Sequence, residues 1–193
     1  METTAADCAT PSEGGAASQD AWTGAEVLGE RFQPLYVAVY GCLLHRLFDA
    51  ELAEELTAET FYRAARAVRR FQGTVGQLRL WLLRTATNLA NSHYRRKRLW
   101  QLVFRRLQRS RPLMDSGEQS LDDSGVLKLQ QVRVALKGLA PRHQSVIALR
   151  YFMDMPFEQI GAVLGCRQDA VRVRLSRALK ALRRQLGLEN KNA

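Results

Sequence analysis

Apolar side chains recur every three or four residues through most of this chain, which is the spacing that places them on one face of an α-helix. The first such segment runs from Glu26 to Leu47. Later segments follow at about residues 50–71, 77–99, 126–139, 141–152, 157–164 and 168–186. No segment sustains the strict alternation of apolar and polar residues that is typical of a half-buried strand. The pattern therefore predicts an all-α protein.

Two segments interrupt the helical pattern and divide the chain. Residues 1–24 are rich in Ala, Thr, Ser, Gly and acidic residues, and we expect them to form a disordered acidic tail. Residues 101–125 end in a polar stretch with Pro and Gly, which predicts a linker. We therefore expect two small helical domains, at 25–100 and 126–188, joined by this flexible linker. A short tail follows at 189–193.

Length and composition exclude several classes of protein. The chain has 193 residues and no uninterrupted apolar run of membrane-spanning length, so we expect no membrane insertion. Its first twenty residues contain no base and no apolar core, which argues against a secretory signal or a transit peptide. The three cysteines, Cys8, Cys42 and Cys166, are far apart and form no CxxC pair. We expect a cytoplasmic protein without metal or cofactor, in which Cys42 and Cys166 are small buried side chains.

The formal charge of +10 is distributed unevenly along the chain. Residues 49–60 hold five acids and no base, whereas residues 61–111 hold 14 bases and no acid. The final segment, 126–193, holds 13 bases and four acids. Such alternation indicates two kinds of partner, one of them a polyanion. The alternative interpretation is a set of solvated helix faces.

The C-terminal segment has the pattern of a helix-turn-helix. A short helix at 157–164 meets a turn at Gly165, a longer helix follows, and Gly161 is small enough to let the two helices approach closely. Polar and basic residues of the second helix lie away from its apolar stripe: Arg172, Arg174, Ser176, Arg177 and Lys180. Arginine pairs with guanine in the major groove and also binds phosphates. The alternative is a helical hairpin with a solvated basic face.

Three segments carry a family resemblance. The segment LRYFMDMPFEQIGAVLGCRQDAVRVRLSRALKALR (149–183) closely resembles region four of bacterial sigma factors of the extracytoplasmic-function (ECF) type, in the sigma-70 family. The segment DAELAEELTAETFYRAARAVRRF (49–71) resembles the core-binding helix of their region two. The segment LRLWLLRTATNLANSHYRRKR (78–98) resembles the next helix, which reads the upstream edge of the transcription bubble. The resemblance covers about residues 26–188.

The resemblance implies a protein that binds core RNA polymerase, directs it to promoter DNA and opens the DNA without being an enzyme itself. Four residues match positions that dock on the polymerase clamp helices: Glu54, Glu55, Glu59 and Phe61. Seven match the helix that faces the minus-ten element: Trp81, Arg84, Asn88, Tyr94, Arg95, Arg96 and Lys97. The family's base-capturing loop corresponds to residues 72–77. Trp81 has a second interpretation as a core residue, because it lies on the apolar stripe.

In the same family the recognition helix reads the minus-thirty-five element. By that resemblance we expect Arg172 and Ser176 to contact base edges and Arg174 and Arg177 to contact phosphates. Lys180 completes the face. The family also implies contact with the polymerase flap, an anti-sigma partner and nucleoid association during activity. Ala58 stands where the family often has Gln, and Arg167 stands where it usually has a Ser or Thr cap.

Two other functions compete with this interpretation. A stand-alone helix-turn-helix regulator would bind duplex DNA without core polymerase, with residues 26–100 as a dimerisation or sensing domain. An enzyme such as a nuclease fits less well, because the acidic stretch 49–60 contains no histidine. His45, His93 and His143 also lack the spacing of metal ligands.

Overall fold

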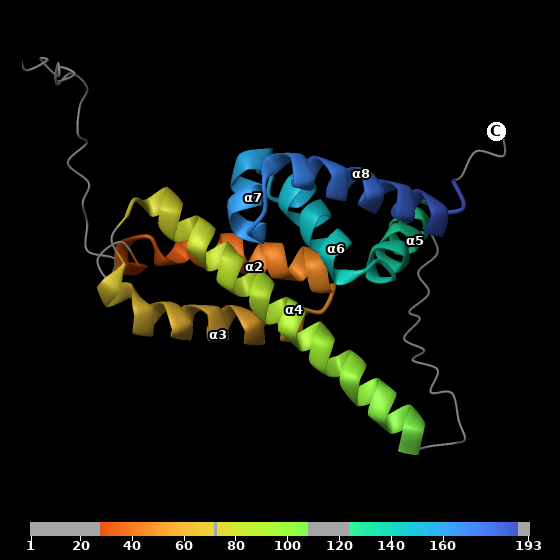
Figure 1. Ribbon diagram of the computed structural model, residues 1–193, viewed down its shortest axis with the longest axis horizontal. Coiled ribbons are helices and arrows are strands. Elements are labelled where there is room, and N and C mark those ends of the chain that lie inside the picture. The colour runs from red at the N-terminus through yellow and green to blue at the C-terminus, as the bar shows by residue number, and fades with distance from the viewer. Residues whose placement is uncertain (1–27, 72, 108–123, 189–193) are drawn as a thin grey trace, which may run out of the picture.

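The computed structural model describes residues 28–71, 73–107 and 124–188, and its regular elements there are helices (Figure 1). Their bounds are α2 Phe32–Leu47, α3 Ala50–Ala67, a 3-10 turn at Val68–Arg70, α4 Val75–Leu107, α5 Ser124–Lys137, α6 Pro141–Ile147, a π-helical turn at Ala148–Phe152, α7 Phe157–Leu164 and α8 Gln168–Gln185. We call α2–α4 the N-terminal module and α5–α8 the C-terminal module.

Local hydrogen bonds fix where the long helices begin. The side chain of Asp49 accepts a hydrogen bond from the Leu52 amide at 3.0 Å, which caps α3. Before α4, Thr74 and Gln77 form a reciprocal capping box. The Thr74 amide donates to Gln77 Oε1 at 2.9 Å, and the Gln77 amide donates to Thr74 Oγ1 at 3.3 Å. These bonds satisfy amides that a helix start leaves without intrahelical partners.

The turn between α7 and α8 confirms the predicted helix-turn-helix. Gly165 ends α7 in the left-handed conformation, with φ of 66°, which glycine adopts without strain. A Cβ atom on Gly161 would lie 2.6 Å from the backbone oxygen of Cys166, so only glycine permits this close approach. The sharp turn therefore follows from two glycines that the sequence places four residues apart.

Several boundaries differ from the sequence predictions. The second helix ends at Ala67 rather than Phe71, because the chain tightens into the 3-10 turn. The third helix, α4, continues to Leu107, so the first residues of the expected linker are helical. The expected helix 141–152 changes to π-helical geometry from Ala148. The expected tails and the rest of the linker lie outside the described residues.

The two modules pack against each other through one hydrophobic core (Figure 1). His45 of α2 stacks on Phe152 of the π-helical turn, with ring centroids 4.3 Å apart and an angle of 4° between the planes. Arg133 of α5 donates to the carbonyl oxygen of Phe48 at 2.8 Å. The all-α fold with two small helical domains is confirmed, and the described parts of the two domains are in direct contact.

Candidate nucleic-acid and polymerase interfaces

The recognition helix α8 presents the predicted residues on one side and buries the other. Val171, Leu175 and Ala178 pack into the core. Arg172, Ser176, Arg177 and Lys180 are exposed, and Arg174 is half-buried at the edge of that face. The N-cap residue of α8, Arg167, makes no side-chain capping bond, as expected where it replaces Ser or Thr. The outer face of α8 is therefore a cationic surface on a rigid helix.

The cationic surface extends from α8 onto α6, a continuation that the sequence analysis missed. Burial lowers the pKa of His143, and the neighbouring cations Arg142, Arg174 and Arg177 lower it further. Like charges disfavour the protonated imidazole, so these groups share one electrostatic surface. Their joint field attracts a polyanion more strongly than α8 alone would.

Arg172 lies over the aromatic ring of Phe157, the first residue of α7, with its guanidinium carbon 5.0 Å from the ring centroid. Arg150 lies over the same ring at 5.2 Å. Arg150 is itself held, because its Nη1 donates to the Met155 carbonyl at 2.9 Å. Such cation–π contacts limit the conformations that a long arginine side chain samples. Phe157 thus gives Arg172 a preferred position, which spacing along α8 could not reveal.

Val173 is also part of the outer face of α8, although the sequence analysis treated only polar residues there. Its side chain is 51% exposed. An apolar group on a helix that enters the major groove can contact the methyl group of thymine. Ser176 and Arg177 follow Val173 by three and four residues, so helical spacing places Val173 next to both on the exposed face.

The predicted minus-ten residues on α4 are divided among different faces. Arg84, Asn88 and Arg95 are exposed and share one face by helical spacing. Trp81 is half-buried against the core, with its ring centroid 6.5 Å from that of Phe71, which agrees with its structural interpretation. Tyr94 is half-buried in the contact between the modules. The exposed part of the predicted set is therefore smaller than the sequence indicated.

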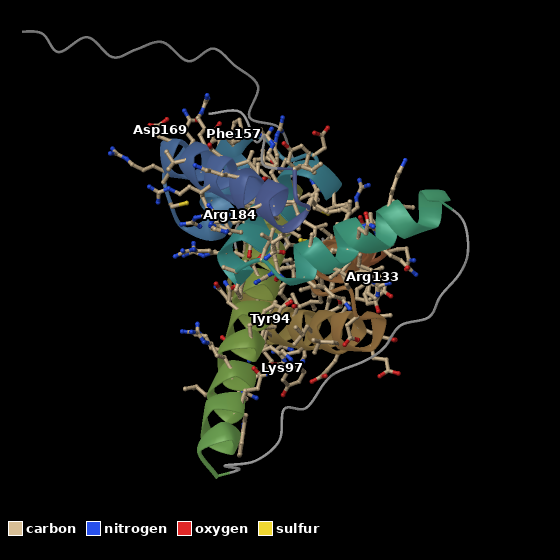
Figure 2. The ribbon with its side chains drawn as sticks, turned by 90° about the vertical axis from the view of Figure 1, so that its right-hand side faces the viewer. Tyr94, Lys97, Arg133, Phe157, Asp169 and Arg184 are labelled. Atoms are coloured by element: carbon tan, nitrogen blue, oxygen red, sulfur yellow. The ribbon has the colours of Figure 1, made fainter. Side chains whose placement is uncertain are left out.

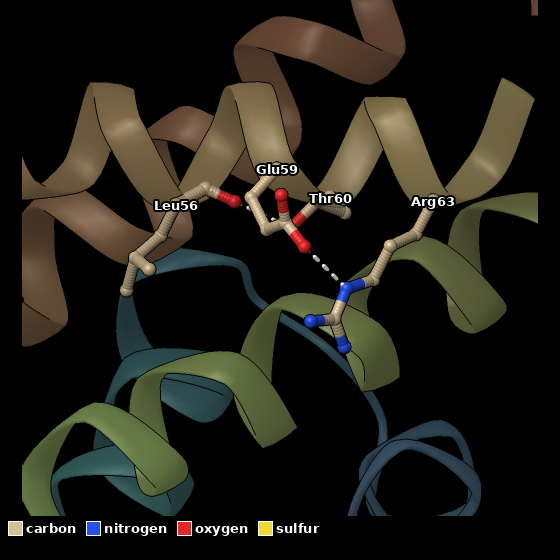
Figure 3. Close-up of polar contacts among 4 residues, drawn as sticks. All are labelled: Leu56, Glu59, Thr60 and Arg63. Carbon is tan, nitrogen blue, oxygen red and sulfur yellow. Dashed lines mark hydrogen bonds and ion pairs between the residues drawn. The ribbon is translucent and has the colours of Figure 1, made fainter. Parts of the chain in front are cut away.

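A groove of about 680 Å³ runs between α3 and α4. Its α3 wall includes Glu55 and Glu59, and its α4 wall includes Asn88 and Arg96. Glu59 Oε1 also accepts from Arg63 Nε at 2.6 Å (Figure 3). The groove brings together residues that the sequence assigned to two different partners.

The four residues assigned to polymerase docking do not share one surface. Glu54 and Glu55 are exposed, and Glu59 is partly exposed. Phe61 is buried, with its ring centroid 5.0 Å from that of Phe32 and 5.7 Å from that of Tyr36. Phe61 therefore holds α3 against α2 in this arrangement, and its ring does not face solvent.

Arg46 is a buried cation that the sequence analysis did not single out. It is 1% exposed, and its guanidinium donates to the Thr87 carbonyl at 3.1 Å and to Asn91 Oδ1 at 2.5 Å. It also lies over the ring of Tyr94 at 6.0 Å. Burial lowers the pKa of Arg46 to about 10, which still leaves it charged at neutral pH. Arg46 thereby ties α2 to the middle of α4.

Burial also affects the two groups beside Arg46. It raises the pKa of the Cys42 thiol to about 11 against the opposing effect of Arg46, so this cysteine is protonated and behaves as a small apolar residue, as predicted. Burial raises the pKa of Tyr94, and this rise is opposed by Arg46 and by a polar contact from Gln144 of α6. Cys166 is half-buried.

The resemblance assigns residues 72–77 to a base-capturing loop, but residues 75–77 form the first turn of α4. Thr74 and Gln77 are engaged in the capping box. Gly73 lies so close to Gln77 that a Cβ atom would be 2.5 Å from its side-chain oxygen. A base that enters this loop would have to compete with those bonds.

Within residues 28–71, 73–107 and 124–188, no three His, Cys, Asp or Glu side chains are grouped so that they could hold a metal ion. No helix in the same part of the chain is both long and apolar enough to cross a bilayer.

Two basic surfaces, on α4 and on α8, thus flank a helical body whose second half ends in a helix-turn-helix. Figure 2 shows them well separated, with Phe157 and Asp169 at one end and Lys97 toward the other. This architecture defines a DNA-binding protein with two contact surfaces on one chain.

Comparisons with known proteins identify the family. Residues 28–99 match the family model for sigma-70 region 2, and residues 135–184 match that for sigma-70 region 4. RNA polymerase sigma factor CarQ of Myxococcus xanthus is 30% identical over 77% of this chain and 83% of its own length. RNA polymerase sigma factor YlaC of Bacillus subtilis is 29% identical over 80% of this chain and 89% of its own.

A third relative is longer. The ECF RNA polymerase sigma factor BldN of Streptomyces coelicolor is 27% identical over 84% of this chain, which spans 61% of BldN. Among solved structures, sigma factor RpoE in complex with the anti-sigma factor NepR from Bartonella quintana has a TM-score of 0.64 at 22% identity. The match covers 84% of this chain and 98% of RpoE. That likeness confirms the fold.

The chain belongs to the sigma-70 family of RNA polymerase sigma factors, and several of its relatives, BldN among them, are ECF sigma factors. It is a sigma factor that directs promoter-specific transcription, as the resemblance of its three motifs predicted.

Proposed function

We propose that the N-terminal module binds core RNA polymerase and the minus-ten element, while α8 reads the minus-thirty-five element. The separation of charge carries this proposal. Acids dominate the start of α3, whereas cations dominate the exposed parts of α4 and α8. An acidic surface suits a basic protein partner, and a basic surface suits DNA.

On the DNA side, α8 enters the major groove. Arg172 and Ser176 contact base edges, Arg174 and Arg177 contact phosphates, and Lys180 lies along the same face. Arg84, Asn88, Arg95, Arg96 and Lys97 of α4 face the minus-ten element, where the DNA opens. On the polymerase side, Glu54, Glu55 and Glu59 dock on the clamp helices, while the C-terminal module contacts the flap. The polymerase performs the chemistry, so this protein itself is not an enzyme.

Run-off transcription with purified core polymerase tests the proposal. We expect specific transcripts from promoters of the source genome only when both proteins are present. Tight, specific binding to duplex DNA without core polymerase would instead support the stand-alone regulator. If transcription starts at none of these promoters, the assignment of these surfaces to core polymerase and promoter DNA is wrong.

A charge reversal tests the docking surface separately. The double variant Glu54→Lys/Glu55→Lys should weaken capture of core polymerase in a native pull-down, because it places cations where the partner is basic. Glu30→Lys changes an exposed acid outside α3 and serves as the control. Equal capture by all three proteins would place the docking surface elsewhere.

The direct packing of the two modules supports an anti-sigma partner. In the packed arrangement Tyr94 lies between the two modules. Arg84 approaches the α7–α8 turn, because its Nη2 would be 3.7 Å from a Cβ atom placed on Gly165. An anti-sigma protein that stabilises this arrangement would keep part of α4 from DNA. RpoE, the solved sigma factor with the same fold, was crystallised with such a partner. Purification from the native host that yields polymerase alone would contradict this proposal.

The proposal also gives the protein a location. It acts in the cytoplasm, on the nucleoid, where promoter DNA and core polymerase are found. A fluorescent fusion that follows the nucleoid under inducing conditions would support it, and one held at the cell envelope would oppose it.

A further inference from the structure

The C-terminal end of α4 extends beyond the body of the protein (Figure 1). Of the α4 side chains that the structure describes, up to residue 101, the last fully buried one is Ala90, and residues 95–101 are all exposed. From Arg95 to Leu107 the helix is about 20 Å long at the usual rise per residue. Among the residues of this extension whose side chains the structure describes, 95–101, the large apolar ones are Leu99 at 62% exposure and Trp100 at 68%. An exposed tryptophan beside an exposed leucine is typical of a contact surface.

Helical spacing places Trp100 with cations. Arg96 and Lys97 precede it by four and three residues, so all three side chains share a face of α4. Arg96 also lines the groove between α3 and α4. The surface that begins in the groove therefore continues along α4 to Trp100. We call Arg96, Lys97 and Trp100 the α4 tip.

The charge around the α4 tip selects the kind of occupant. Arg95, Arg96, Lys97 and Arg98 are consecutive cations, and the stretch 61–111 to which they belong contains no acid. These cations lie nine or more residues before α4 ends at Leu107, so the helix dipole, which acts within the last turn, does not explain them. A cationic groove combined with an aromatic side chain is the combination by which proteins bind single-stranded nucleic acid, because bases stack on the ring while cations hold the phosphates.

We propose that Trp100 stacks on an unpaired base of promoter DNA at the edge of the melted segment, with Arg96 and Lys97 holding the adjacent phosphates. This inference rests on the proposed function, because it needs α4 to face the DNA where it opens. It adds a base-stacking residue outside the motif that the family resemblance covers.

Four variants in the polymerase holoenzyme test the proposal: Trp100→Ala, Trp100→Leu, Trp100→Phe and the control Leu99→Ala. Open-complex formation is measured by permanganate reactivity of unpaired thymines on a duplex promoter. Affinity is measured on a promoter with a pre-melted segment. Loss of one base stack should weaken binding to the pre-melted promoter roughly 5- to 100-fold. We expect that loss for Trp100→Ala and Trp100→Leu, while Trp100→Phe and Leu99→Ala stay near wild type.

The leucine variant separates stacking from apolar contact. If Trp100→Leu matches Trp100→Phe, the side chain docks on an apolar protein surface and the proposal is wrong. If every Trp100 variant equals an active wild-type protein, Trp100 has no role in opening. A wild-type holoenzyme that starts no transcript would instead overturn the proposed function. Because Trp100 is exposed, these substitutions should leave the helical circular-dichroism spectrum and the unfolding temperature unchanged, which verifies that each variant is folded.

Discussion

At the scale of single residues, Arg46 has the most demanding environment. It carries a charge into the core, where it bonds to Thr87 and Asn91 of α4 and lies over Tyr94. Its Nε is buried without a hydrogen-bond partner among the described residues, so the site stabilises the charge only in part. A buried polar side chain of this kind specifies how two helices meet, because any shift between them breaks its bonds.

Arg46→Ala should lower the free energy of unfolding by about 3 kcal/mol, because it leaves a cavity and removes the donor from the buried Thr87 carbonyl and the part-buried Asn91 side chain. Chemical denaturation followed by circular dichroism measures the change. Arg95→Ala is the matched control, since Arg95 is exposed and bonds only to Ser92 at 3.2 Å in the described structure. We expect the control to change stability by less than about 0.5 kcal/mol. If both variants lose a similar free energy of unfolding, the burial of Arg46 does not account for its effect on stability.

Phe157 should act on promoter discrimination through Arg172. Removing the ring in Phe157→Ala frees the guanidinium that lies over it, and we expect a loss of about 1 kcal/mol in discrimination against a mutated minus-thirty-five sequence. In an Arg172→Ala background the same change should have almost no further effect. Competition binding by the holoenzyme provides the four values of this double-mutant cycle. Additive losses would show that Phe157 acts independently of Arg172.

At the scale of elements, the α7–α8 pair depends on one close approach. Gly161→Ala should destabilise the C-terminal module by about 1–3 kcal/mol, because the new Cβ meets a backbone oxygen that cannot move aside easily. Gly41→Ala in α2 is a useful control, since nothing lies within 4 Å of its Cβ position. There alanine should raise stability by up to about 1 kcal/mol through helix propensity. Thermal unfolding distinguishes the two, and a stabilised Gly161→Ala would contradict the steric argument.

Elements with strong local signals were predictable from the sequence, while the surfaces they form together were less so. Asp49 predicted the start of a helix and Gly165 the end of one. In the structure Asp49 caps α3 and Gly165 ends α7. Phe61 was assigned to the polymerase-docking surface because it matches a family position there, but its partners Phe32 and Tyr36 lie on α2. Only packing between helices decides which side of α3 is covered. For the same reason, the burial of Arg46 and Tyr94 could not be derived from their own segments.

At the scale of the whole molecule, the packing of the two modules is the property with the widest effect. The stack of His45 on Phe152 and the bond from Arg133 to the Phe48 carbonyl both cross between them. Tyr94 of α4 is half-buried against the shared core, with a polar contact from Gln144 of α6, and Arg84 approaches the α7–α8 turn. The same chain therefore presents α8 freely while part of α4 is covered.

The double variant His45→Ala/Phe152→Ala should loosen this packing, because it removes both rings of a close stack. Small-angle X-ray scattering should then give a larger radius of gyration, with the helix content unchanged. Tyr151→Ala removes a neighbouring aromatic side chain that is exposed, and it should leave the radius unchanged. An unaltered radius for the double variant would mean that other contacts hold the modules together.

The covering of part of α4 also weakens the apparent affinity for any ligand that must contact the covered face. Only the fraction of molecules with the modules apart can bind such a ligand, so its apparent dissociation constant rises by the inverse of that fraction. Each 1.4 kcal/mol of contact free energy between the modules corresponds to about a tenfold weaker apparent affinity. A partner that binds only when the modules are apart must supply this contact free energy on binding. A partner that binds the packed form stabilises that form further. Small sequence changes at the stack of His45 on Phe152 can therefore adjust how much of the protein is needed before transcription begins.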